Sequence, residues 1–204
     1  MPDKLYNQII GGAIRDYHDQ MLGKAKWPDE SLISSSFESI WCWIEKNHFY
    51  NCSLWDQEDQ ARRNDVDPSQ IVTNKRNIDR FNQLRNDSIE KINDLVLEFF
   101  SSVDYSNSKF TNSETIGSVI DRMSITSLKI HHMKKFLDRS DSTSNVSPNS
   151  FKLIQLSQQR DDLISCYNQI LSGLRSGEII FKIYRQHKMY NDSKMNPYLA
   201  GIKS

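Results

Sequence analysis

The sequence contains few of the residues that form turns. Only 7 glycines and 5 prolines occur among its 204 residues. All-β sandwiches and doubly wound α/β sheets need many tight turns, in which these residues predominate. Their scarcity argues against both classes of fold. The polar mean hydropathy of −0.64 suits helices with one face in water, so the composition favours an all-α protein.

An excess of charge of one sign is also missing, as is a long apolar run. Lys and Arg together number 26, which equals the number of Asp and Glu. Nucleic-acid binders usually carry a basic surplus, because phosphate contacts provide much of their affinity. No segment approaches the roughly 20 apolar residues that span a bilayer, and the start, Met1-Pro2-Asp3-Lys4, does not resemble a signal peptide. We therefore expect a cytoplasmic protein with no nucleic acid polymer as partner and no membrane insertion.

Several familiar chemical motifs are absent. The three cysteines, Cys42, Cys52 and Cys166, are an odd number without the spacing of metal ligands, which favours free thiols in a reducing compartment. The sequence has no phosphate-binding glycine loop, no nucleophile elbow and no HExxH motif. His131 and His132 are adjacent, so on a helix they point in different directions and cannot chelate one ion.

Apolar residues recur at helical spacing along most of the chain. The clearest pattern predicts a helix over 68–100, with Pro68 in its first turn. Further helices are expected over 5–22, from an N-cap signature at Ser34–Ser36 to about Arg63, over 114–137 and over 151–174, with a short helical piece at 179–188. Between them lie a polar linker at 101–112 and an exposed loop at 138–150, and a tail follows at 193–204. The sequence thus predicts a single domain over 1–204, a helical bundle with three long helices and shorter flanking helices.

Two charged residues interrupt apolar faces of these helices. Arg85 falls inside the apolar stripe of the helix over 68–100, and Asp121 lies in the helix over 114–137, which is apolar on two sides. A buried charge is costly unless it is paired. We therefore predict that Arg85 meets a carboxylate from another helix, with Asp121 as the candidate. The residues alone leave open whether this pair has a structural or a functional role.

Polar stripes on the helices are the remaining candidates for chemistry. The densest one contains Asn82, Gln83, Asn86, Asp87, Glu90 and Asp94. Carboxylates at helical spacing can bind divalent metals or act as general acid and base, although such a stripe is more often a solvated face. On another helix Trp55, Glu58 and Arg62 share one face, where a tryptophan beside a carboxylate could stack a base.

Five runs together resemble the bacterial domain of unknown function 4254 family. They are LWDQEDQARRNDV (54–66), KRNIDRFNQLRNDSIEKIND (75–94), NSETIGSVIDRMSITSLKIHHM (112–133), LSQQRDDL (156–163) and YRQHKMYND (184–192). The resemblance implies an all-helical fold with a polar pocket built from these runs, and it suggests nucleoside hydrolysis as the activity. Cleavage of an N-glycosidic bond passes through an oxocarbenium-like transition state, which carboxylates can stabilise.

On this basis we expect a small-molecule substrate and Asp87, Glu90 and Asp121 as catalytic residues. The expected substrate-binding residues are Trp55, Glu58, Asn82, Arg85, Asn86, Glu114, Arg122, Lys188, Tyr190, Asn191 and Asp192. A first alternative is a Mg²⁺-dependent nucleotide pyrophosphohydrolase. A divalent cation, Mg²⁺ or Ca²⁺, is therefore a candidate cofactor. A second alternative is a non-catalytic interaction protein, for instance in envelope polysaccharide assembly. A homodimer is also expected, because long helices that are apolar on two sides often pack against a second copy.

Overall fold

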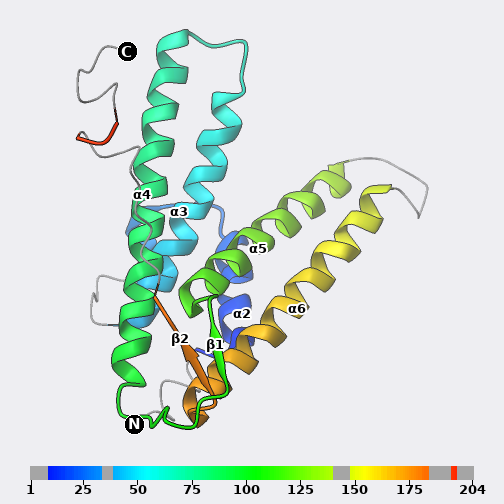
Figure 1. The fold of residues 1–204 in the computed structure, drawn as a ribbon. Helices are drawn as coiled ribbons and strands as arrows, with labels where there is room; N and C mark the ends of the chain where they lie inside the picture. Colours follow the sequence, from blue (N-terminus) through cyan, green and yellow to red (C-terminus); the bar gives the residue numbers. More distant parts are fainter. Residues whose placement is uncertain (1–8, 34–38, 140–147, 184–193, 197–204) are drawn as a thin grey trace.

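The computed structural model of the chain describes residues 9–33, 39–139, 148–183 and 194–196. This part is almost entirely helical, which confirms the predicted all-α fold (Figure 1). The helices are α2 (Gly11–Leu22), the short 3-10 helix η1 (Glu30–Leu32), α3 (Ile40–Ala61), α4 (Pro68–Phe99), α5 (Ile116–Arg139) and α6 (Pro148–Ser176), and the strands are β1 (Phe110–Asn112) and β2 (Ile179–Phe181). None of the described helices is long and apolar enough to cross a membrane.

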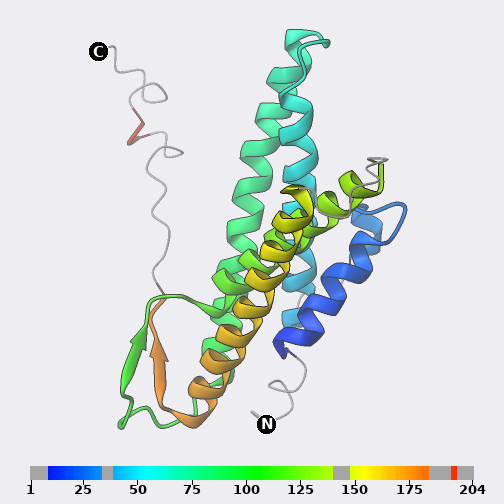
Figure 2. The same ribbon diagram turned by 90° about the vertical axis from the view of Figure 1, so that its right-hand side faces the viewer.

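The four longest helices form two antiparallel pairs. Helices α3 and α4 make one long hairpin, whose tip stands clear of the other elements in both views (Figures 1 and 2). Helices α5 and α6 make the second pair, which packs obliquely against the first. Helix α2 lies beside α5, and the two strands lie near the first turn of α5 (Figure 2). Helix α5 therefore contacts the hairpin of α3 and α4 as well as α6.

Each of the five α-helices in the described residues contributes at least one fully buried aliphatic side chain to the core. Ile14, Ile44, Ile92, Ile120 and Leu171 come from α2 to α6 in turn, and each is 0% exposed. Burial of one such side chain contributes about 1.5–3 kcal/mol. The helices are therefore held together by a single shared core, which also fixes the positions of the polar side chains discussed below.

Helices α4 and α5 approach closely at Gly117. A Cβ atom on Gly117 would lie 2.5 Å from the carbonyl oxygen of Ile89, which is closer than real Cβ contacts come. The backbone N–H of Gly117 donates a hydrogen bond to Oδ1 of Asn93 at 2.8 Å. The absence of a side chain at Gly117 thus allows the two helices to touch near the start of α5.

Helix starts follow from capping side chains. Ser39 accepts a hydrogen bond from the backbone of Trp41, and Asp67 accepts one from Ser69 with Pro68 in the first helical position. Such caps satisfy backbone donors that have no partner within the helix. The boundaries of α4 agree with the prediction. Helix α3 begins later than expected, because Ser39 rather than the Ser34–Ser36 signature provides its cap.

The structure corrects the first part of the short helix predicted at 179–188, whose residues 184–188 lie outside the described residues. Residues 179–181 form β2, which pairs in parallel with β1 inside the supposed linker, so that Phe110 lies opposite Ile179. Gly177 has a φ of +78°, a left-handed conformation that ends α6 at Ser176. A Cβ on Gly177 would lie 2.3 Å from the carbonyl oxygen of Asp104. The chain therefore passes close to Asp104 at Gly177 and then continues into β2 beside β1.

Other boundaries differ as well. The loop expected at 138–150 is shorter in the structure, because α5 continues to Arg139 and α6 already begins at Pro148, where proline fits a first helical position. Helix α2 begins at Gly11, whereas a start at residue 5 was expected. The first residues of that expected helix, the Ser34–Ser36 signature and most of the tail at 193–204 lie outside the described residues.

Candidate functional site

Asp121 is the centre of a buried polar cluster between α3, α4 and α5. Asn47 and Asn51, one turn apart on α3, each donate a hydrogen bond from Nδ2 to Oδ1 of Asp121 at 2.9 Å. Arg85 on α4 brings its Nε to 3.9 Å from the same oxygen. Asp121 is 8% exposed as a residue, so the charge predicted inside an apolar helix is buried and has a cationic neighbour. Each of these contacts is made to Oδ1, and no hydrogen bond to Oδ2 is found among the described residues.

The cluster continues into a layer of buried histidines. Asn51 also donates to Oγ of Ser124 at 3.1 Å, and Nδ1 of His48 lies 2.8 Å from that oxygen. The His48 ring stacks on His18 with 4.4 Å between the ring centroids. Burial lowers the pKa of His48 to about 3 and also lowers the pKa of His18. Both imidazoles are therefore neutral near pH 7 and form an uncharged support behind the cluster.

A small cleft, which we call the Arg85 cleft, lies against this cluster. It has a volume of about 270 Å³ and is lined by residues of α3, α4 and α5 that include Asn51, Trp55, Glu58, Arg62, Arg85 and Ile125. Glu58 and Arg62 form an ion pair at 3.2 Å on the side of α3. Because Asn51 and Arg85 both line the cleft and contact Asp121, the carboxylate lies directly behind its wall. The side chain of Asp121 retains 12% of its exposure.

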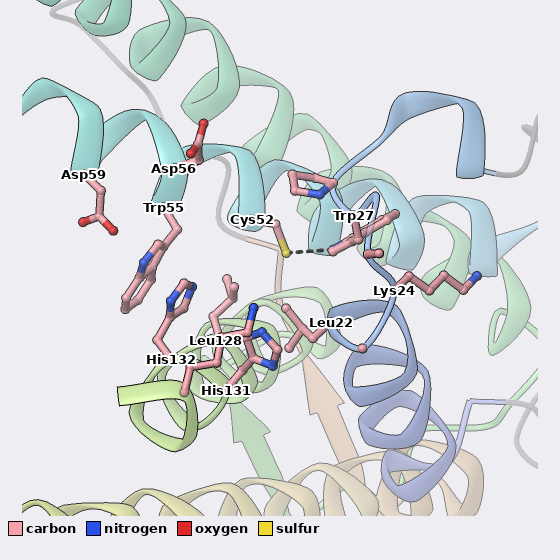
Figure 3. A pocket seen from close by; sticks show the side chains of 14 residues that line it. Leu22, Lys24, Trp27, Cys52, Trp55, Asp56, Asp59, Leu128, His131 and His132 are labelled. Carbon is pink, nitrogen blue, oxygen red and sulfur yellow. Dashed lines mark hydrogen bonds between the residues drawn. The ribbon is translucent and has the colours of Figure 1, made fainter. Parts of the chain in front are cut away.

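A larger cavity of about 680 Å³, which we call the histidine pocket, opens beside the cleft (Figure 3). Trp27 lies on one side, Trp55 and His132 on the other, and His131 points into the space between them. Nε1 of Trp27 donates a hydrogen bond to Sγ of Cys52 at 3.1 Å. Flat rings from α3, α5 and the segment that follows α2 thus form part of the wall of the cavity.

A third cavity, the Asn86 pocket, lies where α4 meets the start of α5. It has a volume of about 190 Å³, and Asn86, Glu90, Glu114 and Ser118 line it. Oγ of Ser118 donates to Glu114 at 2.9 Å. Oδ1 of Asn86 is buried without a hydrogen-bond partner in the described residues. The pocket is polar but small.

The predicted site residues are divided between these cavities. Trp55, Glu58 and Arg85 line the Arg85 cleft with Asp121 behind them, whereas Glu90 lines the Asn86 pocket. The structure therefore does not bring the three expected catalytic carboxylates into one cavity. Asp87 is exposed, and its Oδ1 accepts a hydrogen bond from Gln83 on the same helix at 2.7 Å.

The other predicted residues are placed as follows. Asn86 and Glu114 line the Asn86 pocket, and Asn82 is half-buried on α4. Arg122 is exposed, 3.8 Å from Glu114, and with it lines a shallow groove beside β1. Lys188, Tyr190, Asn191 and Asp192 lie outside the described residues. Their assignment to substrate binding stays a prediction.

Sequence reasoning missed several residues of the site. Asn47 and Asn51 carry no charge, but they stand one turn apart on a helix face that also holds the buried Ile44, and this spacing was the available signal. Trp27 was not among the predicted site residues, and His131 was considered only as a metal ligand and rejected as one. Among the described residues, no group of three or more His, Cys, Asp or Glu side chains is placed to hold a metal ion.

Comparison with known proteins places the chain in a family. A search of curated proteins finds no match, and a search of solved structures finds none either. The family model described as "Protein of unknown function (DUF4254)" matches residues 41–183, which run from the second residue of α3 to just beyond β2. The match contains the Asp121 cluster and most of the residues of the three cavities, but the run at 184–192 follows its end. Since the match spans more than half of the sequence, this chain belongs to the DUF4254 family.

Proposed function

We propose that the protein hydrolyses the N-glycosidic bond of a nucleoside or a related small N-glycoside in the Arg85 cleft. The observation that carries this proposal is the fixed carboxylate of Asp121. Its Oδ1 is held by two amide donors at 2.9 Å and faces Arg85, and the side chain lies behind the wall of a cleft that also contains Trp55. A carboxylate with a fixed orientation directly behind the wall of a small cleft suits the electrostatic stabilisation of a cationic sugar.

The reaction needs three events at one carbon. Water adds to the anomeric carbon while the C–N bond breaks, and the electron pair of that bond leaves with the base, which takes up a proton. The water gives one proton to a carboxylate and keeps the other in the new hydroxyl group of the sugar. The carboxylate then releases its proton to solvent, and solvent supplies the proton that the base takes up. In the proposal Asp121 stabilises the oxocarbenium character through Oδ2, because its Oδ1 is already engaged.

The second carboxylate comes from Glu58. It lines the same cleft from α3 and is half-buried, with Arg62 at 3.2 Å. Glu58 would accept the proton from water, and the Arg85 guanidinium would bind sugar hydroxyls with its other N–H donors. The cleft is built by a single chain, so the proposal does not depend on the expected homodimer or on a cytoplasmic location.

The first experiment is a chromatographic assay of purified protein with single nucleosides and nucleotides. We expect release of free base and free sugar, and we expect Asp121→Asn to lower the rate by about 10²-fold or more. The matched control is Asp79→Asn, which removes an exposed carboxylate on α4 that pairs with Lys75. This variant should retain the wild-type rate.

The alternatives predict other products. Release of pyrophosphate that stops with EDTA and returns with Mg²⁺ would replace the proposal by the pyrophosphohydrolase. Absence of any product from every nucleoside and nucleotide would contradict the hydrolase and favour the non-catalytic interaction protein. A wild-type rate in Asp121→Asn would show that the reaction occurs outside the Arg85 cleft.

A further inference from the structure

The histidine pocket and the Arg85 cleft are neighbours that share part of their walls. Trp55, Asp59 and Leu128 line both cavities. A ligand that occupies the cleft and extends past the Trp55 side chain therefore enters the histidine pocket. The two cavities can hold two different parts of one molecule.

Aromatic rings with fixed orientations define the histidine pocket. The Trp55 indole stacks on His132 with 4.5 Å between centroids and 8° between planes, and the Trp27 indole stacks on the buried His48 at 5.6 Å and 16°. Each indole is thus stacked on an imidazole, and Figure 3 shows the pair formed by Trp55 and His132. Flat rings in fixed positions favour a ligand that is itself flat.

The charges in the pocket do not favour an anionic or a cationic ligand. The lining contains two lysines, Lys24 and Lys135, and two aspartates, Asp56 and Asp59, so its formal charges balance. Asp59 also pairs with Arg62 at 3.2 Å, and Asp56 accepts a hydrogen bond from Gln60 at 2.7 Å. A neutral ligand with hydrogen-bonding edges fits this balance better than a phosphate group.

We propose that the histidine pocket binds the planar heteroaromatic group of the substrate, which is the nucleobase that leaves. This inference rests on the proposed N-glycosidase and names the part of the substrate that each cavity receives. The sugar lies in the Arg85 cleft against Asp121, and the base extends past Trp55 between the rings of the histidine pocket.

His131 recognises the edge of the base. It lines the pocket next to His132, and its ring stands at 90° to that of His132, so its nitrogens are directed differently from the stacked ring. Partial burial is the main cause that lowers the pKa of His131, which keeps the imidazole neutral near pH 7. A neutral imidazole has one donor and one acceptor, and both can pair with a base edge.

The experiment is a calorimetric titration of the whole protein with free adenine, hypoxanthine, uracil and cytosine, and with ribose as a separate probe. We expect at least one base to bind, and we expect Trp55→Leu to weaken its binding by roughly 5- to 150-fold, the range for loss of one stacking contact. Trp55→Phe retains a flat ring and should recover most of the affinity. Phe110→Leu, which changes an aromatic residue that is 67% exposed on β1, is the matched control. Circular dichroism confirms that each variant is folded.

The outcomes separate this inference from the proposed function, because binding of a free base needs no turnover. Base binding that is lost in Trp55→Leu and restored in Trp55→Phe supports the inference even when no nucleoside is cleaved. If no base binds while nucleosides are still hydrolysed, the inference fails and the N-glycosidase stands. Equal base affinity in wild type and Trp55→Leu also overturns the inference, because the base then binds elsewhere.

Discussion

Nε of Arg85 lies 3.9 Å from Oδ1 of Asp121, close enough for an ion pair but too far for a hydrogen bond. The same Nε is buried and has no hydrogen-bond partner among the described residues. The two opposite charges are therefore close together, but Nε of Arg85 makes no hydrogen bond within the described residues. A buried pair of this kind is a weak source of stability, but removal of one partner leaves a costly unpaired charge.

Asp121→Asn should lower stability, because the amide leaves the guanidinium of Arg85 without a counter-charge. We expect a loss of about 1–3 kcal/mol, measured by thermal denaturation as a fall of about 2–4 °C for each kcal/mol. Addition of Arg85→Met to Asp121→Asn should restore part of the loss, since it removes the unpaired charge. An unchanged melting temperature in Asp121→Asn would show that the pair is not energetically coupled.

Gly117→Ala should separate α4 from α5. The new methyl group would lie 2.5 Å from the carbonyl oxygen of Ile89, so we expect a loss of about 1–3 kcal/mol in chemical denaturation. The matched control is Gly12→Ala in α2, where a Cβ would meet nothing within 4 Å. There the same change should stabilise the protein by about 0.5–1 kcal/mol. Equal effects of the two changes would contradict the close approach at Gly117.

Stability should fall on acidification because His18 and His48 are buried in neutral form. Burial lowers the pKa of His48 to about 3 and lowers that of His18, whereas in the unfolded chain both titrate near the ordinary value of about 6.5. The contribution of the two histidines to the free energy of unfolding is thus fully present above about pH 6.5, and it is lost as the pH falls from there toward about 3. The slope should reach at most about 1.4 kcal/mol per pH unit for each histidine.

His18→Phe tests this dependence. The ring nitrogens of His18 have no hydrogen-bond partner within the part of the chain that the structure describes, so phenylalanine removes a titrating group while it keeps a ring against His48. Urea denaturation between about pH 7 and about pH 5 should give a shallower loss of stability for the variant than for the wild type. If stability falls equally with pH in the two proteins, His18 does not contribute to the pH dependence of stability.

The cysteines should differ in reactivity. Cys166 on α6 is exposed, whereas Cys42 and Cys52 are buried, and burial raises the pKa of Cys52 to about 12. Since the thiolate is the reactive form, a thiol reagent should label one cysteine quickly in the folded protein and all three in denaturant. Cys166→Ser should abolish the fast phase, and a fast phase that persists in this variant would contradict the burial of the other two.

Local patterns were sufficient for much of this fold. The helix over Pro68–Phe99 was predicted with its boundaries, because the proline, the cap and the apolar stripe all lie within the segment. The pairing of Arg85 with Asp121 was also predictable, since each charge interrupts an apolar face and must find a partner. Both inferences needed only the rule that apolar faces are buried and that buried charges are paired.

Other features depend on contacts between distant segments. Asn86 belongs to a polar stripe, a pattern that is more often a solvated face, yet it is 6% exposed and lines the pocket at the start of α5. Residues 179–181 have an apolar pattern that fits either a helix or a strand. They form a strand because they pair with β1, which is distant in the sequence. The site could not be read from one stripe, because its walls come from α3, α4 and α5 together.

The pairing of β1 with β2 also has a consequence for the order of folding. Ser108 and Glu178, at the ends of this pairing, are 70 positions apart in the sequence, and α5 and α6 lie between them. Helices and their hairpins have mostly local contacts, whereas a long-range strand pair can close only after the intervening chain is compact. The two three-residue strands should therefore form late and open early. Their amides should exchange before those of the helices, and during refolding their protection should appear only after the chain between them has folded.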